Sequence, residues 1–467
     1  MMLTTPVSAE TLKEALVRTY NDNPSLAAAR AQLRATDETV VIQRASGLPG
    51  VDASGSFSEL VRQSTPAVVS PQRLVRGNVS LNVPVYQGGA VRNGILAAEN
   101  RVEAGRADLR GTESFIFSQV VAAYMDVILN EALVDLSANN VEVLDINLQA
   151  TSDRFEIGDL TRTDVAQSQS RLAVAQGNLQ NAQANLVNAR EQYLALTGLP
   201  PVDLQAPPPL PGLPATPDDA VDVALEHNPD LIAAREAAEA AGFDTEVAGS
   251  GRLPRLSLFA STDYQNFLGT LPSGSNSGTD LTVGAQVSIP LFQGGRPAAQ
   301  QRQASAFERA ALENAIAVER NVIAQVRAAF SSWRAANAVI VSSEAAVDAA
   351  ELSLEGVRAE NTVGNRTILD ILDAQQELLN AQVQLVTARR NAYVAGFTLL
   401  AAMGRAEARD LGLEDEGPLY NPIDNYDRVR GIIWDWQRDP QPVATSSRTV
   451  DIPAQHGEIS VNEPSGD

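Results

Sequence analysis

Nearly the same phrase occurs twice in this chain, and its repetition constrains the fold more than any other feature. Residues 83–94 read VPVYQGGAVRNG, and residues 289–300 read IPLFQGGRPAAQ, 206 positions later. Gly158 and Gly364 stand at the same separation. Repeats this long are not the small stacked units of a solenoid. The chain is therefore predicted to contain two copies of one half-protein.

The duplication also predicts the domain boundaries. The segment NDNPSLAAARAQLRA at 21–35 corresponds to EHNPDLIAAREAAEA at 226–240, so the repeat covers most of the chain. A proline-rich stretch joins the two copies, and the Pro, Ser and Gly content after Arg438 predicts a disordered end. The expected units are a first repeat, a linker, a second repeat, a tail and a disordered end: 1–205, 206–218, 219–404, 405–438 and 439–467.

The composition excludes several classes of function. A net charge of -22 argues against acidic partners such as nucleic acid or an anionic membrane surface. The chain has no cysteine, and its two histidines, His227 and His456, lie far apart, so a disulfide, a thiolate and a histidine metal cluster are excluded. We interpret His227 as a helix-start or loop residue. The sequence contains no phosphate loop, activated nucleophile or metal set, so we expect neither an enzyme nor a cofactor.

Four segments show the alternation of β-strands. Apolar and polar residues alternate over 76–86 and 281–292, and the segments 51–60 and 255–264 are plausible partners. A length of about ten residues is typical of strands in a membrane β-barrel. Four strands cannot close a barrel, and open sheet edges are not viable in lipid, so several chains must share one barrel. The predicted strand pairs occupy 50–86 and 254–292.

Long helices account for most of the remaining chain. No proline interrupts the helical pattern between Ala90 and Ile157, which at 1.5 Å per residue gives a helix of ~100 Å. From Thr161 to Thr197 apolar residues recur every seven positions, with alanine prominent in a second row, which favours close coiled-coil packing. Thr161 and Thr367 fit N-caps of the returning helices. The predicted helical hairpins occupy 90–198 and 296–403.

The N-terminal residues indicate export. TTPVSAETL at 4–12 resembles the end of a secretory signal, with small residues from Val7 to Ala9 and with the charged and apolar regions of the signal missing. No run approaches the ~18 apolar residues that a membrane helix requires. In a Gram-negative cell, we therefore expect the protein in the periplasm, in the outer membrane or outside the cell.

These features together resemble the TolC-like outer-membrane channel family. The resemblance covers roughly residues 10–430, and its most specific part is VGNRTILDILDAQQELLNAQVQLVTARRNAYV at 363–394. It implies a mostly α-helical homotrimer, in which a 12-stranded outer-membrane β-barrel continues into a periplasmic tunnel of twelve helices. The tail at 405–438 would join the equatorial girdle of this tunnel. The implied partners are a periplasmic adaptor, an inner-membrane ABC transporter or proton-driven pump, and outer-membrane lipid.

The resemblance also implies a gate at the periplasmic end. The acidic ring of the family matches Asp370 and Asp373, so three chains would place six carboxylates around a narrow, cation-attracting entrance. The linking arginine of the family matches Arg366, and its partners match Thr163 and Asp164. We therefore expect Arg366 to contact Asp164 and hold the hairpins closed. The tyrosine of this latch corresponds here to Asn361, so the closed state is expected to differ in strength or geometry.

Glycines mark two further kinds of position. The turns between strands and long helices are expected to act as hinges because glycine adopts backbone angles that other residues avoid. Gly158 and Gly364 are expected at the hairpin tips, where the resemblance implies contact with the adaptor. The hinge glycines are Gly88, Gly89, Gly294 and Gly295.

The expected function is a passive exit duct powered by its partners. The cluster YDRVRGIIWDWQ at 426–437 is similar to the tails of family members that serve type I secretion, which favours a secreted polypeptide over small toxic compounds as cargo. Trp333 is interpreted as a packing residue. A trimeric coiled-coil spacer or adhesin on the cell surface would explain the heptads, but it would not explain amphipathic strand pairs before each hairpin.

Overall fold

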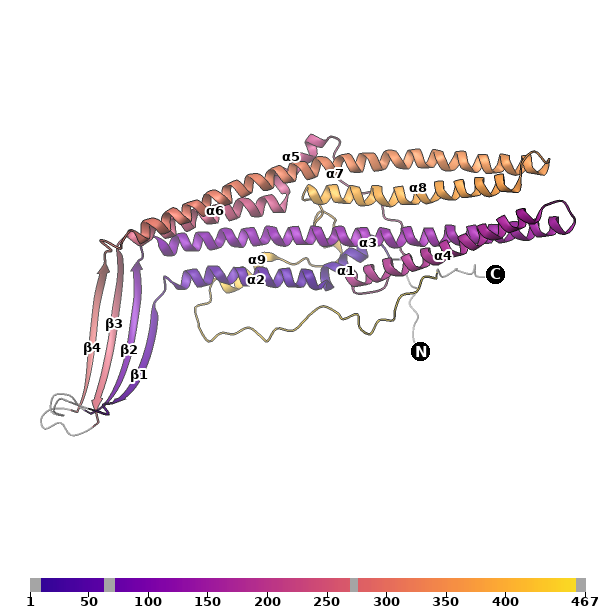
Figure 1. Cartoon of the computed structure of the whole chain (residues 1–467). Helices are drawn as coiled ribbons and strands as arrows, with labels where there is room; N and C mark the ends of the chain where they lie inside the picture. Colours follow the sequence, from indigo (N-terminus) through magenta and orange to yellow (C-terminus); the bar gives the residue numbers. More distant parts are fainter. Residues whose placement is uncertain (1–9, 63–71, 269–275, 459–467) are drawn as a thin grey trace.

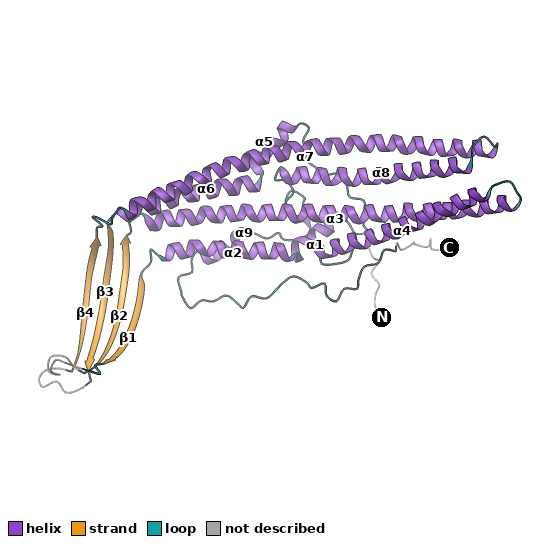
Figure 2. Cartoon of the chain, in the orientation of Figure 1, coloured by secondary structure: helices purple, strands orange, loops and turns teal. Residues whose placement is uncertain are grey.

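The chain forms an elongated molecule with a β-sheet at one end and long helices running away from it (Figure 1). The computed structural model describes residues 10–62, 72–268 and 276–458. Each half contributes two strands and one long helical hairpin (Figure 2). The predicted combination of four strands and two hairpins is confirmed.

The sheet joins the two halves of the chain. Its strands are β1 (Gly50–Glu59), β2 (Arg73–Tyr86), β3 (Arg255–Phe267) and β4 (Ser277–Ser288). They pair antiparallel in the order β1-β2-β3-β4, and the register of the central pair places Asn78 opposite Asp263. Within the described residues, β1 and β4 each have a neighbouring strand on one side only.

The two faces of the sheet differ in chemistry. On one face the amide of Asn78 donates a hydrogen bond to Asp263 across 2.8 Å. The other face carries exposed apolar side chains, among them Val79, Leu258 and Val283. An apolar outer face and a polar inner face are what a strand between lipid and an aqueous pore requires.

The fourth strand begins and ends four residues earlier than the sequence predicts, at Ser277 and Ser288. The alternation suggested a strand as far as residue 292, but β4 ends at Ser288. Pro290 lacks the N–H group that would continue a ladder, and the pairing with β3 already ends at Arg255. Ile289, Leu291 and Phe292 follow as exposed apolar side chains.

Each hairpin pairs one long helix with a helix of about half its length. In the first half, α3 (Ala90–Glu156) and α4 (Arg162–Thr197) pack together, and in the second half α7 (Arg296–Thr362) pairs with α8 (Ile368–Ala402). Both α3 and α7 have 67 residues. None of the described helices combines the length and the apolar character needed to cross a membrane. The heptad rows of α4 face inward as predicted, with these members buried: Ser168, Leu172, Ala175, Leu186, Ala189 and Tyr193.

Four shorter helices fill the spaces beside the long ones. They are α1 (Leu12–Asp22), α2 (Pro24–Ala45), α5 (Pro217–His227) and α6 (Pro229–Gly249), and a single 3-10 turn (Ser250–Arg252) follows α6. The repeated NP phrase starts α2 and α6, because Asn23 and Asn228 cap them and proline occupies the first turn. α2 packs on α3, whereas α6 packs on both α3 and α7.

His227 is the last residue of α5 and not a helix-start or loop residue. Its Nδ1 atom lies 3.2 Å from the carbonyl oxygen of Val223 in the preceding turn. Asn228, directly after it, both ends α5 and caps α6. Asn228 alone therefore separates α5 from α6, whereas the sequence pattern predicted only the start of one helix at this place.

The largest apolar core lies near the middle of the molecule. Phe117, Tyr124 and Tyr193 are fully buried there, where α1 covers α3 and α4. The hydroxyl of Tyr124 donates to the carbonyl oxygen of Gln205 at 2.6 Å and lies 2.9 Å from that of Glu10. A second core lies under α5, where Phe330 and Trp333 meet edge to face at 5.8 Å. Trp333 is thus a packing residue, as predicted.

The C-terminal segment is more structured than its composition predicts. After a 3-10 turn (Leu413–Glu416) and α9 (Pro422–Val429), residues 439–458 run as an extended chain along the body. The backbone N–H of Ser447 donates to Asp22, and that of Gln455 donates to Glu191, at 2.8 and 2.9 Å. Arg190 donates to the carbonyl oxygen of His456 at 2.7 Å. Side chains of α1 and α4 therefore hold this segment, although its own apolar content is low.

Candidate functional site

The tips of both hairpins lie at the end of the molecule opposite the sheet (Figure 1). Gly158 and Gly364 form the turns with φ angles of +84° and +83°. A Cβ atom added to either glycine would meet open space, so backbone conformation alone favours glycine there. Ile157 and Val363, the preceding residues in the two repeats, are exposed apolar side chains.

A capping box begins α4 at the first tip. The carboxylate of Asp164 accepts hydrogen bonds from the backbone N–H and the hydroxyl of Thr161, both at 2.8 Å. The N–H of Asp164 donates back to the Thr161 hydroxyl. These bonds from Thr161 lower the pKa of Asp164, because they stabilise the ionised form. Thr163 is exposed in the same turn.

The second tip repeats this arrangement. The carboxylate of Asp370 accepts from the hydroxyl and the backbone N–H of Thr367, at 2.7 and 2.8 Å. The hydroxyl, then the N–H and, to a smaller extent, Arg366 lower the pKa of Asp370. Thr161 and Thr367 are therefore N-caps, as predicted, and both tips carry an ionised carboxylate in a defined place.

Arg366 finds its partners within its own turn. Its guanidinium donates to Glu360 at 2.7 Å and lies 3.8 Å from Asp370. The hydrogen bond and charge of Glu360 raise the pKa of Arg366. The amide of Asn361 donates to the carbonyl oxygen of Arg366 at 2.7 Å. The structure thus joins Arg366 and Asn361, but it does not form the predicted contact between Arg366 and Asp164.

A different ion pair joins the two hairpins. Arg171 on α4 donates to the carboxylate of Asp373 on α8 at 2.6 Å. Asp373 was predicted as a member of an acidic ring, whereas Arg171 was not singled out. The heptad pattern of each hairpin does not predict this contact. It determines how the two helices of one hairpin pack, but not how far one hairpin is shifted along the other.

Apolar and amide side chains support the ion pair. Leu172, next to Arg171, and Leu372, next to Asp373, are buried in one small cluster. Two residues beyond Asp373, the side-chain amide oxygen of the buried Gln375 accepts a hydrogen bond from the amide of Asn147 on α3 at 3.0 Å. The inner ends of the hairpins are therefore fastened by one ion pair, one amide bond and a leucine contact.

The strand-to-helix turns have the unusual backbone that was predicted for them. The φ angles of Gly88, Gly89, Gly294 and Gly295 lie between +61° and +85°. Only the first of these is tightly packed: a Cβ atom on Gly88 would lie 2.8 Å from the Cβ of Leu253. The first hinge is thus held against the connection between α6 and β3.

The arrangement can hold or release charged links, and it contains no set of reacting groups. Among the described residues, no three His, Asp or Glu side chains come together in a way that could hold a metal ion. The carboxylates of Asp164, Asp370 and Asp373 are engaged in caps and an ion pair. The polar contacts at the hairpin tips therefore serve to attach helices to one another.

Comparisons with known proteins agree with this architecture. The chain matches the family described as "Outer membrane efflux protein" over residues 15–199 and 220–405. It is 33% identical to the outer membrane efflux protein BepC of Brucella suis over 422 residues, which are 90% of this chain and 91% of the relative. It is 29% identical to the alkaline protease secretion protein AprF of Pseudomonas aeruginosa, covering 65% of this chain and 64% of that one.

A solved structure shares the fold. The crystal structure of the outer membrane protein VceC from Vibrio cholerae superposes with a TM-score of 0.73 at 23% identity, covering 84% of this chain and 96% of that one. The family match spans both repeats, and BepC matches almost the full length. The chain therefore belongs to the outer membrane efflux protein family of TolC-like channels, as an outer-membrane protein that extends into the periplasm and serves tripartite export as a duct, not as an enzyme.

Proposed function

We propose that three copies of this chain form a continuous passive duct, which receives cargo from an inner-membrane transporter through a periplasmic adaptor. The observation that carries the proposal is the pairing of a four-stranded sheet with open edges at one end and two hairpins at the other. Unpaired strand edges cannot remain in lipid, so β4 of one copy must pair with β1 of the next. The number three follows from the family and not from the sheet itself.

The hairpin tips are the proposed docking points for the adaptor. Ile157 and Val363 are exposed apolar residues at equivalent places in the two repeats, beside Gly158 and Gly364. Equivalent tips from three chains would offer a ring of similar sites to a partner with the same symmetry. The energy for transport would come from the inner-membrane component, either an ABC transporter or a proton-driven pump.

The proposed gate is the set of links near these tips. Asp370 and Asp373 remain the candidates for an acidic ring, and Arg366, Thr163, Asp164 and Asn361 remain candidates for a latch when neighbouring copies are present. Within one chain, the Arg171 to Asp373 ion pair is the charged contact nearest the tips among those that join the second hairpin to the first, since Arg390 on α8 also binds Asp126 on α3 nearer the middle of the molecule. Opening would require this pair to separate.

Two cargo classes fit such a duct. Similarity to BepC over nearly the whole chain favours efflux, for which small toxic compounds are the expected cargo. Similarity to AprF, a protease secretion protein, favours secreted polypeptides, as does the tail at 426–437. The helix α9 holds the start of that tail against α2, so the tail gives no direct information about the lumen through which cargo would pass. For this reason we place efflux first.

Single-channel recording in planar lipid tests the duct. Purified protein is expected to give long-lived, cation-preferring conductance steps, and cross-linking in detergent is expected to give trimers. A coiled-coil spacer would conduct nothing. A sample that remains monomeric and soluble without detergent would overturn the proposal.

A further inference from the structure

The helix α9 runs beside α2 toward the sheet. Its residue Asn425 donates to the buried Asp37 at 2.7 Å, and five residues later the carbonyl oxygen of Arg430 accepts from Arg44. Both helices therefore run in the same direction. Since Arg44 lies in the last turn of α2, six residues before β1 begins, the chain leaves α9 next to the base of the strands.

The residues after α9 form a closed loop with exposed apolar side chains. Arg428 binds Asp439 through both carboxylate oxygens, each at 3.0 Å, which closes the loop 431–438. We call this segment the tryptophan loop. Ile433, Trp434 and Trp436 are 72%, 68% and 74% exposed within it. Three large apolar side chains exposed side by side indicate a surface that is covered in the working protein.

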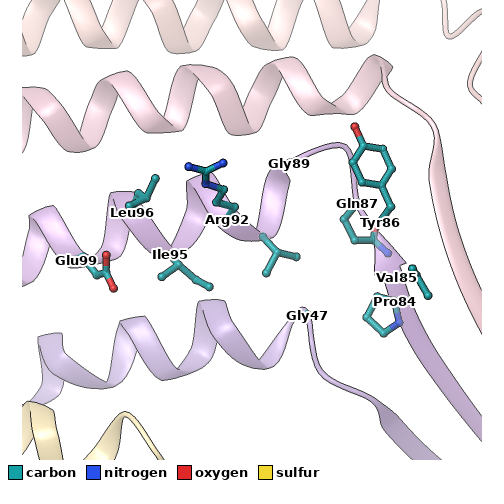
Figure 3. Close-up of a pocket in the computed structure, with 11 residues that line it drawn as sticks. Gly47, Pro84, Val85, Tyr86, Gln87, Gly89, Arg92, Ile95, Leu96 and Glu99 are labelled. Atoms are coloured by element: carbon teal, nitrogen blue, oxygen red, sulfur yellow. The ribbon is translucent and has the colours of Figure 1, made fainter.

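A groove connects this region with the apolar face of the sheet. It has a volume of about 710 Å³ and lies between the ends of α2, α3 and β2 (Figure 3). Val85, at the end of the outer apolar row of β2, lines one side, and Ile95 of α3 lines another. Ile95 and Tyr426 of α9 pack against the same buried cluster of Val40, Ala98 and Val102. The hydroxyl of Tyr426 lies 3.4 Å from Glu99 at the far end of the groove.

The apolar strand face, the groove and α9 therefore form one continuous outer surface. The polar face of the sheet, marked by Asn78 and Asp263, lies on the opposite side. Val85, on the apolar face, lines one end of the groove, and α9, from which the tryptophan loop continues, lies at the Glu99 end. In the proposed barrel, this is the height at which the headgroups of the periplasmic leaflet would meet the protein.

From this position we infer that the tryptophan loop rests in the headgroup region of the periplasmic leaflet, with phospholipid as its partner. Indole rings prefer this region because they are largely apolar and carry one N–H donor. Arg438, at the end of the loop, places a guanidinium where phosphate groups would lie. The loop would fix the height of the helical wall relative to the membrane, beside the hinge at Gly88 and Gly89.

Fluorescence of the native side chains tests this inference. The chain contains three tryptophans, and the third, Trp333, lies in the core under α5. The variant Trp333→Phe therefore reports on the loop alone, and the double variant Trp434→Phe with Trp436→Phe reports on Trp333 alone. Both are reconstituted into phosphatidylethanolamine and phosphatidylglycerol vesicles, with bromine placed near the headgroup or near the chain end in matched samples.

In the Trp333→Phe variant, the emission of Trp434 and Trp436 is expected to fall by roughly half or more when the lipid carries bromine near the headgroup. It should fall clearly less when the bromine lies near the chain end. Trp333 should lose little in either sample. Emission that is red-shifted, quenched by acrylamide and insensitive to bromine would place the loop in water. Blue-shifted emission that is insensitive to bromine and the same in detergent would place it against a neighbouring copy. Either of these results would overturn the inference.

Discussion

Arg171 on α4 and Asp373 on α8 are joined by a hydrogen-bonded ion pair of 2.6 Å that links the two hairpins near their tips. Both side chains are about half exposed, so the pair is screened by water and salt. In the proposed gate, a weak link would hold the hairpins together without making their separation costly. In a ring of several copies, the small free energies of the individual ion pairs would add, so that the closed state would be stabilised cooperatively.

Arg171→Gln is expected to raise the open fraction of the channel. An exposed ion pair contributes about 0.2–1 kcal/mol, so a single pair shifts an open-to-closed ratio by about fivefold at most, and three pairs acting together shift it further. Single-channel recording at low salt measures this ratio. Asp373→Asn should act in the same direction, and the double variant should add little.

Arg389→Gln provides the matched control. Arg389 on α8 pairs with Glu344 on α7 at 3.1 Å, so this exposed pair lies within one hairpin. Its loss is expected to leave the open fraction unchanged. An equal effect of both substitutions would assign the change to general loss of charge and not to the link between hairpins.

The role of Arg366 can be separated into two cases. Its guanidinium binds Glu360 in its own turn, whereas the family resemblance implies a contact with Asp164. If the local contact matters, Glu360→Gln should reproduce the conductance of Arg366→Gln. If the latch forms between neighbouring copies, Asp164→Asn should reproduce it instead. A conductance that no member of this set alters would remove Arg366 from the gate.

The hinge glycines predict an asymmetry between the repeats. Gly88 and Gly294 are equivalent and have φ angles of +65° and +61°, so an alanine at either position bears a similar backbone strain of about 1–2 kcal/mol. Only Gly88 is crowded, by Leu253 and Ser250. Gly88→Ala should therefore lower the thermal unfolding temperature more than Gly294→Ala. Equal losses in both variants would show that backbone strain alone sets the cost.

Glu113 predicts a pH-dependent stability. Burial raises the pKa of Glu113 from 4.5 to about 7, although the backbone N–H of Ala408 donates to it at 2.6 Å. The folded state then binds the proton more tightly than the unfolded state, so this contribution to stability is full below about pH 4.5 and is lost as the pH rises through about 7.

Glu113→Gln should remove this dependence, because an amide keeps the acceptor for Ala408 and carries no charge. Relative to the unmodified protein, the variant should gain a few °C in melting temperature between about pH 5 and pH 8, measured by scanning calorimetry in detergent. Asp230→Asn, at the exposed start of α6, is a control with a surface carboxylate. A melting-temperature difference between the Glu113 variant and the unmodified protein that does not change with pH would contradict the assignment.

Much of the fold follows from local patterns. The absence of proline from 90 to 157 predicted α3, and the threonines at 161 and 367 predicted the starts of α4 and α8, because caps and periodicity are written within a few residues. The end of β4 was not predictable in this way. The alternation continues to Phe292, and the loss of a ladder partner beyond Arg255 is visible only in the sheet.

The candidate site was predictable in position but not in its contacts. Both tips and all four hinge glycines follow from the repeat, whereas Arg171 reaches Asp373 only because the two hairpins pack at one particular offset. The ordered path of residues 439–458 was missed for the same reason. Its partners Asp22, Arg190 and Glu191 lie hundreds of positions away, and its own composition indicates disorder.

Within the part of the chain that the structure describes, the strands β1 and β4 each leave one edge of hydrogen-bonding groups without a partner. In any ring built from such chains, a defective copy that still pairs its edges would be incorporated beside sound ones. Co-expression of a gate variant with the unaltered gene should therefore produce mixed assemblies whose behaviour follows the impaired member. Such a mutation would therefore be dominant over the unaltered gene, because the open edges of β1 and β4 bring both kinds of copy into one assembly.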